Sequence, residues 1–423
     1  MAILILVLLS LIAISVPIAM ALGMAALIVL QERSIPLIAI PQVVFESLDS
    51  FTLMALPLYV LAGHLMTAGG IATRLVEFAK ALVSWVRGGL TAAVVLTSML
   101  FATISGSSAA TAAAIGSMLI PQMERQRYPR AFSAAVTASS AELGVIIPPS
   151  VAMIVYGVTT GTSITELFLA GFLPGLMIAG SLMATVIAMS WVKSYGERQS
   201  FFMPDWSRAV LRSMGRAWAS LLMPVLILGG IFGGIFTATE AAGIAVFYAL
   251  FLGLFVYREL SFRQLPQIVA QAAVTSAVVM IIVAFAAMFG FSLHLLRAPQ
   301  AIGALLTSMT DDPLVFLLLV NVFLLIVGMF METFAAIIIL GPILVPIARA
   351  YGIEATHFGI IMIVNLAVGM VTPPVGVNLF IACGIARVSM EKLMRPLSVL
   401  LLVLIVNLLI ITYVPGISLA LIR

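Results

Sequence analysis

Apolar runs long enough to cross a lipid bilayer fill most of this sequence. They lie at about residues 2–30, 51–70, 90–121, 131–158, 165–192, 217–257, 267–295, 314–348, 356–386 and 396–422. One crossing of a bilayer core takes about 20 helical residues. Only 9% of the 423 residues are charged, whereas a soluble domain carries about 25%. The sequence therefore predicts an all-α polytopic membrane protein embedded in the lipid bilayer.

The positions of Lys and Arg predict which ends of the spans face the cytoplasm. Sixteen of the 20 lie in alternate connections, at residues 74–87, 125–130, 193–216, 258–263 and 387–395. Connections with an excess of Lys and Arg are usually cytoplasmic. The C-terminus is then expected outside, and so is the N-terminus if Pro17 divides the first apolar run into two spans. Because these residues anchor a membrane protein, the net charge of +4 does not indicate a nucleic-acid partner.

The two halves of the chain share a weak repeat. The segment GVIIPPS at 144–150 recurs as GMVTPPV at 369–375, which places Pro148 and Pro373 225 positions apart. Five predicted crossings separate the two hairpins described next, because a polar turn at Thr237–Glu240 divides one long run. The halves therefore have opposite orientations, as in secondary transporters, whose substrate and ion sites lie near the bilayer midplane. Further pairs in the same order are Ile120-Pro121 with Val345-Pro346, Gly106 with Gly328, and Pro17 with Thr239.

Each half also contains a predicted helical hairpin. The stretch Leu314–Ala348 has 35 residues with Glu332 as its only charge. One helix of that length would measure about 52 Å, well beyond the bilayer core. A re-entrant hairpin that turns near residues 331–334 resolves the excess. Its counterpart runs from Gly88 to Met123 and turns at Ser105–Ser108, where an ordinary polar loop between two full spans is the alternative.

Double prolines at 148–149 and 373–374 interrupt two of the apolar segments. Each pair removes two backbone donors and frees carbonyl oxygens of the preceding turn, which need new partners inside hydrocarbon. Neighbouring helices or hydroxyl groups can supply such partners. Because the breaks occupy equivalent repeat positions, each matched with a hairpin tip, we favour monovalent cations bound by carbonyl and hydroxyl oxygens. Sodium fits such ligands.

The predicted hairpin tips offer complementary groups. Ser105, Ser107 and Ser108 bring hydroxyls beside a glycine that permits a tight turn, and the following helix presents free N–H groups suited to a carboxylate. Glu332, at the other tip, is an acid at membrane depth. A functional role is the default hypothesis for such a residue, and a structural ion pair is the alternative.

Other polar residues are expected to serve mainly structure. Asn365 and Asn378 flank the second break and are equally consistent with a role there and with ordinary interhelical hydrogen bonds. Glu142 and Glu240 are assigned only helix contacts. Asp312 is expected to cap the first arm of the second hairpin.

No motif in the sequence indicates an enzyme. The three histidines are far apart or in different halves, and no HExxH motif or paired catalytic carboxylates occur. A phosphate-binding GxxxxGK motif is also absent, so an ion gradient is the expected energy source. Cys383 is the only cysteine, which excludes an internal disulfide, and it is expected to pack as a small residue between helices.

Five motifs in one order resemble a known family. They are ISGSSAAT (104–111), GVIIPPS (144–150), FTATEAAGIAVFYAL (236–250), GMFMETFAAIIILGPILVP (328–346) and NLAVGMVTPPVGVNLF (365–380). Together they resemble the large membrane subunit, of the DctM or SiaM type, of tripartite ATP-independent periplasmic (TRAP) transporters, over essentially the whole chain. The resemblance implies a bacterial inner-membrane protein with an elevator mechanism and two or more sodium ions per cycle. It also implies a small four-span membrane subunit and a periplasmic substrate-binding protein that delivers an organic anion.

The resemblance further implies particular site residues. The first sodium site would use Ser105 and Ser108 with carbonyls at Gly144, Ile147 and Pro149. The second would use Thr333 with Gly369, Met370, Thr372 and Pro374. Substrate-binding residues would be Ser107, Ser150, Glu332 and Asn378. Because Val375 stands where the first repeat has Ser150, the two repeats differ on the substrate side.

The predicted organisation follows the repeat. Residues 1–87 and 217–312 are expected to form scaffold spans with arm helices, and residues 193–216 a cytoplasmic linker. Residues 88–192 and 313–423 are expected to form the hairpins, broken helices and following spans of a moving transport domain. Neither a cleavable targeting segment nor a fused small subunit is expected at the N-terminus. The predicted function is sodium-driven uptake of an organic anion, such as a C4-dicarboxylate, sialic acid or a similar carboxylate. The alternatives are a stand-alone sodium-coupled dicarboxylate carrier and an integral-membrane enzyme.

Overall fold

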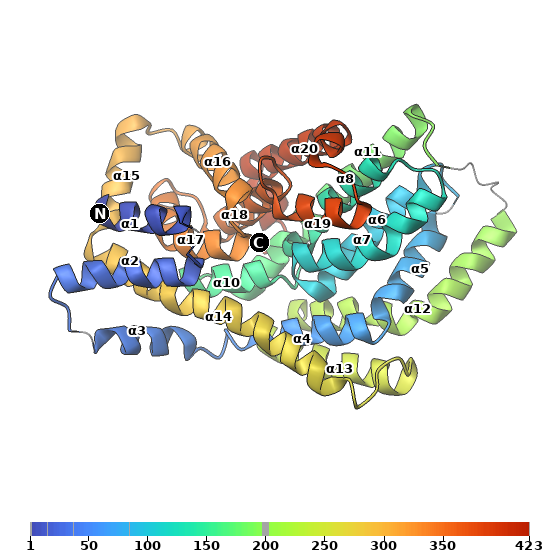
Figure 1. The fold of residues 1–423 in the computed structure, drawn as a ribbon, viewed down its shortest axis with the longest axis horizontal. Helices are drawn as coiled ribbons and strands as arrows, with labels where there is room; N and C mark the ends of the chain where they lie inside the picture. Colours follow the sequence, from blue (N-terminus) through green and yellow to red (C-terminus); the bar gives the residue numbers. More distant parts are fainter. Residues whose placement is uncertain (1, 15, 37, 84, 197–202, 423) are drawn as a thin grey trace.

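The computed structural model describes residues 2–14, 16–36, 38–83, 85–196 and 203–422. In this part of the chain the regular elements are α-helices and one π-helix, with no strand, which confirms the predicted all-α class (Figure 1). The elements are α1 (Ala2–Ala13), α2 (Ile18–Glu32), α3 (Ala39–Leu48), α4 (Ala55–Ala68), α5 (Ile71–Val83), α6 (Gly89–Ser105), α7 (Ser108–Arg125), α8 (Arg130–Ala141), α9 (Leu143–Ile146), α10 (Val151–Thr160), α11 (Ile164–Val192), α12 (Met203–Phe232), α13 (Ala238–Phe251), the π-helix η1 (Leu252–Val256), α14 (Leu265–Leu295), α15 (Ala298–Met309), α16 (Pro313–Phe330), α17 (Thr333–Ala350), α18 (Ala355–Met370), α19 (Val377–Ala386), α20 (Met390–Tyr413) and α21 (Pro415–Leu419).

Several of the described helices are suited to crossing a membrane. Seven are long and apolar enough, and there are up to nine such spans if each of two bent pairs is one span. The bent pairs are α4 with α5, at 68°, and α8–α9 with α10, at 42°. Large apolar side chains also face outward, for example Leu318, Val322 and Phe323 on α16. Apolar surface of this kind needs lipid or a protein partner to cover it. The fold is that of the predicted multi-pass membrane protein.

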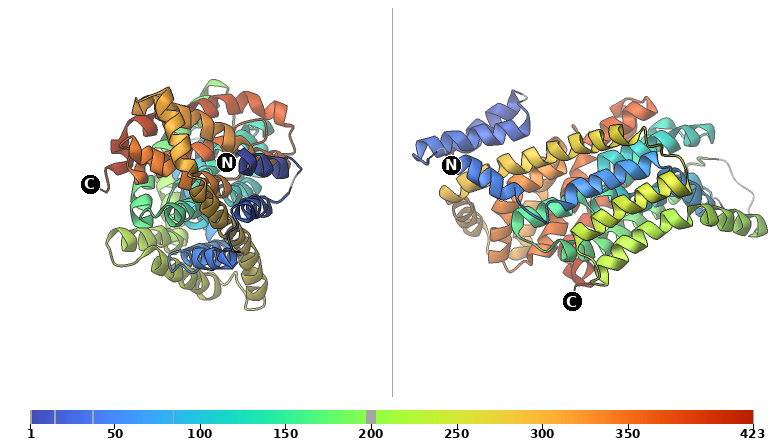
Figure 2. Two further views of the ribbon diagram at one scale, coloured as in Figure 1. Left: turned by 90° about the vertical axis from the view of Figure 1, so that its left-hand side faces the viewer. Right: turned by 90° about the horizontal axis from the view of Figure 1, so that it is seen from below.

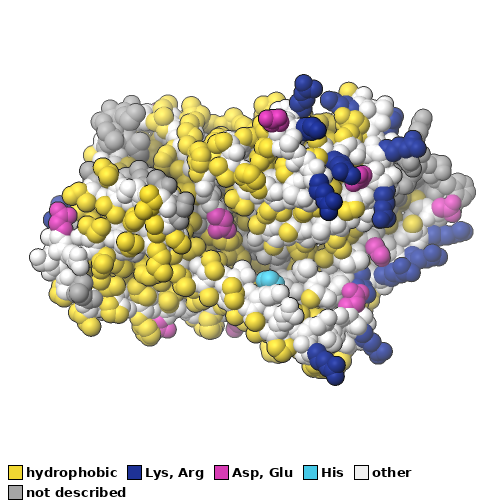
Figure 3. Space-filling model, viewed as in Figure 1, with side chains coloured by type: hydrophobic (Ala, Val, Ile, Leu, Met, Phe, Trp, Pro, Cys, Tyr) yellow, Lys and Arg dark blue, Asp and Glu magenta, His cyan; other side chains and the backbone are white. Residues whose placement is uncertain are grey.

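One end of the molecule carries most of the basic side chains on the face that Figure 3 draws. Lys and Arg gather at the right-hand end, where α5 and α12 lie in the same view in Figure 1, and the left-hand end is mainly apolar. The N-terminus lies at the left-hand end (Figure 1). This distribution agrees with the cytoplasmic side predicted from the loop charges.

Both predicted hairpins are present, as α6–α7 and α16–α17. Their turns fall at residues 106–107 and 331–332, inside the predicted tip segments. In Figure 1 the first hairpin occupies the right-hand half of the molecule and the second the left-hand half, so the tips approach each other from opposite ends. The helix after each hairpin is broken at the proline pair, at 147–150 and at 371–376. Two mirror-related units of hairpin and broken helix therefore meet in the middle of the molecule.

Most helices from the predicted scaffold segments lie together in space. In Figure 1, α2–α4, α13 and α14 lie along the lower side, whereas α1 and α15 lie higher at the left-hand end. α6–α8, α16 and α18–α20 lie in the upper part, and α5, α10 and α12 extend between the two groups; Figure 2 gives two further views of this arrangement. α14 has 31 residues and packs against α2, α3 and α4, while α13 packs against α4. α8 contacts α19 in the upper group, and α10 contacts α17. Helices from the two repeats thus intermix in both groups.

Three local features refine the sequence predictions. The first apolar run breaks near Pro17, but α1 and α2 have only 12 and 15 residues, each shorter than a crossing of about 20. The predicted linker 193–216 is partly helical, because α12 begins at Met203. The polar turn before α13 is a capping box, in which the Thr237 and Glu240 side chains satisfy each other's backbone N–H groups.

Several polar residues outside the hairpin tips make hydrogen bonds within the second half of the chain. The Asp312 side chain caps α16 by accepting from the Leu314 N–H at 2.8 Å. The Asn365 amide donates to Asn321 Oδ1 at 2.7 Å and so joins α18 to α16. His357 is buried, with its ring nitrogens 2.6 Å from Ser418 Oγ and 3.3 Å from the Thr412 carbonyl. These contacts stabilise the second half of the bundle.

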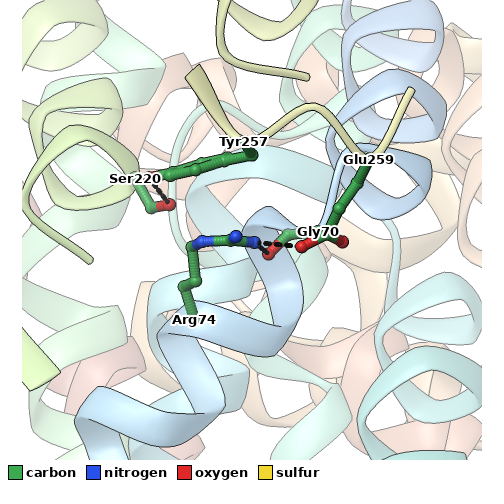
Figure 4. Close-up of polar contacts among 5 residues, drawn as sticks. All are labelled: Gly70, Arg74, Ser220, Tyr257 and Glu259. Carbon is green, nitrogen blue, oxygen red and sulfur yellow. Dashed lines mark hydrogen bonds and ion pairs between the residues drawn. The ribbon is translucent and has the colours of Figure 1, made fainter. Parts of the chain in front are cut away.

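An ion pair joins the arm helix of the first repeat to the second repeat (Figure 4). Arg74 Nη1 on α5 lies 2.7 Å from Glu259 Oε1 and donates to the Gly70 carbonyl at 2.8 Å. The guanidinium also covers the Tyr257 ring, 3.7 Å from its centroid, and the Tyr257 hydroxyl lies 2.8 Å from Ser220 Oγ. These contacts fix α5 to α12 and to the loop after η1. Both halves of the predicted scaffold are thereby tied together at the basic end.

Candidate functional site

The first hairpin tip is a tight turn closed by hydroxyl groups. Gly106 caps α6 with a φ of 60°, which suits glycine, and Ser107 caps α7 by accepting from the Ala110 N–H at 3.4 Å. The Ser105 hydroxyl lies 2.8 Å from the Thr111 hydroxyl, which donates to the Ser107 carbonyl at 2.8 Å. Two hydroxyl oxygens and one carbonyl oxygen therefore converge behind the tip.

The first broken helix packs directly against this tip. The Val151 N–H, at the start of α10, donates to the Gly106 carbonyl at 3.3 Å. Gly144 has no room for a side chain, because a Cβ there would lie 2.6 Å from both Ser107 O and Thr111 Oγ1. Tip and break thus meet through backbone atoms, as the first predicted sodium site requires.

The second tip and the second break repeat this contact. The Gly376 N–H donates to the Met329 carbonyl at 3.2 Å, the counterpart of the backbone bond in the first unit. Gly369 and Gly328 touch backbone to backbone, since a Cβ on Gly369 would lie 2.6 Å from the Gly328 Cα. Two glycines at the crossing of α16 and α18 let the helices approach this closely. The backbone plan of the first unit is therefore present in both.

Most of the predicted ligands of the first sodium site lie at the first contact. Ser105 and Gly144 surround the Ser107 carbonyl, and the Pro149 carbonyl faces the tip, where a Cβ on Gly106 would lie 3.2 Å from it. Ile147 lies in the break itself. Its side chain is a hydrocarbon without a donor atom, so only its backbone carbonyl can serve as a ligand.

Two predicted ligands from different sodium sites meet at one atom. Ser108 is the first residue of α7 and Thr333 the first residue of α17. Their hydroxyls donate to Met370 Sδ at 3.7 and 3.0 Å. The Thr372 hydroxyl donates to the Val368 carbonyl at 2.7 Å, so its lone pairs stay available. The predicted role of Thr372 stays a prediction.

A cavity of about 410 Å³ lies beside the first tip. Ser105 and Ser107 line it from the hairpin, His64 from α4 and Thr275 from α14. Phe334, which follows the second tip, closes another side. A second cavity, of about 550 Å³, lies farther along α14 between α3, α10 and α17. Because α14 starts at the basic end, the first cavity lies nearer that end of the molecule than the second cavity does.

The other predicted substrate residues do not line the first cavity. The Ser150 hydroxyl donates to the Val145 carbonyl at 2.6 Å and also caps α10. Asn378 is fully buried on α19. Glu332 occupies the N-cap position of α17 with no side-chain capping bond, and it is half-buried. Ser107 is thus the one predicted substrate residue at the cavity wall, and the binding roles of Ser150, Glu332 and Asn378 stay predictions.

Glu142 is a buried carboxyl whose place the sequence does not reveal. The Asn378 amide donates to Glu142 Oε1 at 2.7 Å, and Glu142 Oε2 has no hydrogen-bond partner in the described part of the chain. Glu142 precedes the first break and Asn378 follows the second, so this bond joins the two broken helices. The predicted helix contact of Glu142 is confirmed, with a partner 236 positions away.

Thr111, like Glu142, is a residue of the candidate site that sequence reasoning missed. A signal was present, because a residue four positions after Ser107 lies on the same face of α7. Its hydroxyl is buried and reaches back into the turn. Helical spacing from a predicted tip serine would have found it.

The groups at the two contacts suit sodium. They are hydroxyl and carbonyl oxygens, which are ligands for hard cations. Asn365, one turn before Gly369, has a buried Oδ1 with no hydrogen-bond partner among the residues that the structure describes, so it offers an acceptor beside the second break. No group of three His, Cys, Asp or Glu that could hold another metal occurs among the described residues.

A multi-pass helical bundle with two mirror-related hairpins, each meeting a broken helix, is the architecture of a secondary transporter with inverted repeats. The family model described as the tripartite ATP-independent periplasmic transporter, DctM component, matches residues 5–417. The chain belongs to this family, the large membrane subunits of TRAP transporters, and is a multi-pass inner-membrane protein. The predicted resemblance is confirmed.

Three relatives show the range of the family. The chain is 44% identical over 406 residues to the isethionate TRAP transporter permease protein DctMQ of Oleidesulfovibrio alaskensis, covering 96% of this chain and 63% of that protein. It is 42% identical over 377 residues to the C4-dicarboxylate TRAP transporter large permease protein DctM of Pseudomonas aeruginosa, covering 89% and 87%. It is 37% identical over 381 residues to the sialic acid TRAP transporter large permease protein SiaM of Vibrio cholerae, covering 90% and 88%. The chain thus spans less than two thirds of the isethionate permease.

A solved structure shares the fold. The YdaH transporter of Alcanivorax borkumensis superposes with a TM-score of 0.63 at 17% sequence identity, covering 89% of each chain. At this identity the likeness concerns the fold alone.

Proposed function

We propose that this chain carries an organic anion across the bacterial inner membrane, driven by a sodium gradient. A periplasmic binding protein delivers the anion, and a small four-span membrane subunit completes the assembly. The observation that supports this most is the pair of tip-to-break contacts, linked by one backbone hydrogen bond in each unit, from Val151 to Gly106 and from Gly376 to Met329. Membership of the TRAP family supports the tripartite assembly.

Sodium ions bind where oxygens of a tip and a break converge. In the first unit the Thr111 hydroxyl lies within hydrogen-bond distance of both the Ser105 hydroxyl and the Ser107 carbonyl. Each oxygen has a further lone pair, and a cation between tip and break would use several of them together. A bound ion would therefore hold the hairpin against the broken helix.

The anion binds in the 410 Å³ cavity beside Ser107. Ser107 caps α7, and the free N–H groups and macrodipole of a helix N-terminus attract negative charge. A sodium ion behind the same tip adds to this attraction. Anion and cation are therefore proposed to bind together, each lowering the cost of burying the other.

Movement is proposed to be a slide of the hairpin helices against the scaffold helices. α14 borders both cavities and contacts α17, so it lies along the path of such a slide. Moving bare carbonyl oxygens or an unpaired charge through the low-dielectric interior costs several kcal/mol or more. The slide is therefore expected only when sodium and anion are both bound.

The names of the relatives suggest the kind of anion. They refer to isethionate, C4-dicarboxylates and sialic acid, which are all small organic acids. We take a C4-dicarboxylate, sialic acid or a similar carboxylate as the substrate class. The cavity has few polar groups besides hydroxyls, so the choice among these acids is proposed to rest largely with the binding protein.

Transport assays with purified components test this function. The chain and its small subunit would be reconstituted in proteoliposomes and supplied with the binding protein loaded with radiolabelled anion. We expect uptake that follows an imposed sodium gradient and is lost when potassium replaces sodium. Uptake at full rate without sodium would contradict the coupling. Uptake that needs no binding protein would point instead to a stand-alone carrier.

A further inference from the structure

One sulfur atom lies between the two hairpin tips. Ser108 and Thr333 are 225 positions apart, the same spacing as the proline pairs, and each opens the second arm of its hairpin. Both hydroxyls donate to Met370 Sδ, at 3.7 and 3.0 Å. The exposed fractions are 2% for Ser108 and 1% for both Thr333 and Met370, so water has no access to this contact.

These hydroxyls need an acceptor from outside their own helices. A Ser or Thr inside a helix usually donates to the carbonyl four residues before it, as Thr372 does to Val368. Ser108 and Thr333 are the first residues of α7 and α17, so no helical carbonyl precedes them. A buried hydroxyl without a partner destabilises the folded protein. Met370 supplies the acceptor for both.

The repeat does not supply a second sulfur. The residue 225 positions before Met370 is Val145, whose side chain cannot accept a hydrogen bond. The mirror-related hydroxyls therefore share a single acceptor on the second broken helix. Met370 ends α18, directly before the second break, and a Cβ on Gly376 would lie 3.0 Å from the Met370 carbonyl. The same residue thus faces the second break with its backbone and both tips with its side chain.

The chemistry of the contact leaves the hydroxyl oxygens free. A hydroxyl has one hydrogen to donate and two lone pairs to offer, and a thioether sulfur is a weak acceptor. When the hydrogen points to sulfur, the lone pairs point elsewhere and can coordinate a cation. Groups that orient ligands in this way typically change metal affinity by about 10- to 100-fold when they are removed.

We propose that Met370 is a positioning residue shared by both sodium sites, with its sulfur directing the Ser108 and Thr333 oxygens toward two separate ions. This inference rests on the proposed sodium-coupled function. Binding of the first ion fixes Ser108 or Thr333, and through the shared sulfur it orders the hydroxyl of the other site. Sodium binding is therefore cooperative, and one side chain carries the coupling.

Substitution of Met370 by Leu tests this proposal, because Leu keeps an apolar side chain of similar volume and lacks the acceptor. Met362→Leu is the matched control, since Met362 lies on the same helix and is equally buried. The measurement is the thermal stabilisation of the purified complex as sodium is titrated at constant ionic strength with choline. For Met370→Leu we expect the half-effective sodium concentration to rise by about 10- to 100-fold and the titration to lose its steepness. Met362→Leu is expected to titrate like the wild type.

A double-mutant cycle separates orientation from packing. In a Ser108→Ala, Thr333→Ala background the sulfur has no hydroxyl to direct, so adding Met370→Leu is expected to change sodium binding no further. A full additional loss in that background would show a packing effect and overturn the proposal. A Met370→Leu variant whose sodium titration matched that of the wild type would also overturn the proposal. A wild-type complex with no sodium response would overturn the proposed function itself, and this inference with it.

Discussion

The two hairpin units share a backbone plan and differ in their side chains. In each, the broken helix donates one backbone hydrogen bond to the hairpin, and a glycine before the break packs against the tip. The side chains at equivalent positions are unlike: Ser105, Ser107 and Thr111 of the first unit correspond to Phe330, Glu332 and Ala336 of the second. The ligands common to both units are therefore backbone oxygens and the equivalent hydroxyls of Ser108 and Thr333. The hydroxyl cluster of Ser105, Ser107 and Thr111 belongs to the first unit alone.

The starts of the helices that follow the two breaks, α10 and α19, differ as well. The Ser150 side chain caps α10 and also holds the Val145 carbonyl, so side-chain hydrogen bonds fix the start of α10. α19 has no side-chain cap and starts after Gly376, whose φ of 55° only glycine adopts readily. Backbone geometry thus fixes the course of the chain after the second break, whereas a serine side chain fixes it after the first. The units can share sodium binding while only one contributes polar groups to the substrate cavity.

Adding a methyl group at a tip-to-break contact is expected to have the largest effect. Gly369→Ala places a Cβ 2.6 Å from the Gly328 Cα, and Gly144→Ala places one 2.6 Å from Ser107 O. Overpacking of this kind costs about 1–3 kcal/mol, which corresponds to a loss of about tenfold or more in occupancy of the competent state. We expect both variants to lose most of their uptake in proteoliposomes, relative to the amount of folded protein.

The control for these glycines is Gly384→Ala on α19. A Cβ there meets no atom within 4 Å, so transport should be unchanged. If Gly369→Ala transported like Gly384→Ala, the close approach of α16 and α18 would not belong to the ion site. If only Gly144→Ala were impaired, the shared backbone plan would not mean shared function.

Loss of the bond between the two broken helices is expected to come next. Asn378→Leu leaves the buried Glu142 carboxyl without its one described hydrogen-bond partner, and a hydrogen bond to such a group contributes about 1.5–3 kcal/mol. Glu142→Gln keeps an acceptor for the Asn378 amide and should cost less. Thermal unfolding of the detergent-solubilised protein measures both. Equal melting temperatures for the two variants would show that the link between the repeats contributes little.

Removal of the first-tip hydroxyls is expected to affect sodium more than stability. Ser105→Ala with Thr111→Val deletes a hydroxyl pair that has no counterpart in the second unit. Loss of such polar contacts is expected to raise the half-saturating sodium concentration for uptake by about tenfold. Thr103→Val is the matched control, because the Thr103 hydroxyl donates to the Leu100 carbonyl within α6 and lies outside the site. An unchanged sodium dependence in the double variant would assign the first ion to backbone oxygens and the Ser108 hydroxyl.

The sequence predicted the parts of this site that are encoded locally. Proline pairs, a glycine turn and a long stretch with Glu332 as its only charge specify breaks and hairpins from neighbouring residues. The bond from Asn378 to Glu142 and the convergence of Ser108 and Thr333 on Met370 join segments far apart in the chain. No periodicity encodes such contacts, because they arise only when two inverted repeats pack together. The bond from the Ser150 hydroxyl to the Val145 carbonyl is local, and it depends on the course of the backbone through the break.

The smallest effects are expected from the charged second tip, and they show how far the units differ in function. Glu332→Gln removes a negative charge at the start of α17 and keeps its shape. A charge there stabilises a nearby cation or the helix by about 0.3–1 kcal/mol, so we expect the half-saturating sodium concentration to rise by about two- to fivefold. Uptake measured against sodium at saturating anion reports this change.

Ser107→Ala is the corresponding change at the first tip. It removes the cap of α7 at the cavity wall, so the half-saturating concentration of the delivered anion should rise and the sodium dependence should change less. Glu240→Gln, at the exposed capping box of α13, should leave both unchanged, because Gln also serves in a capping box. If Glu332→Gln, Ser107→Ala and Glu240→Gln behaved alike, neither tip side chain would contribute to binding. A sodium effect at Glu332 and an anion effect at Ser107 would instead assign cation binding to both units and anion contact to the first.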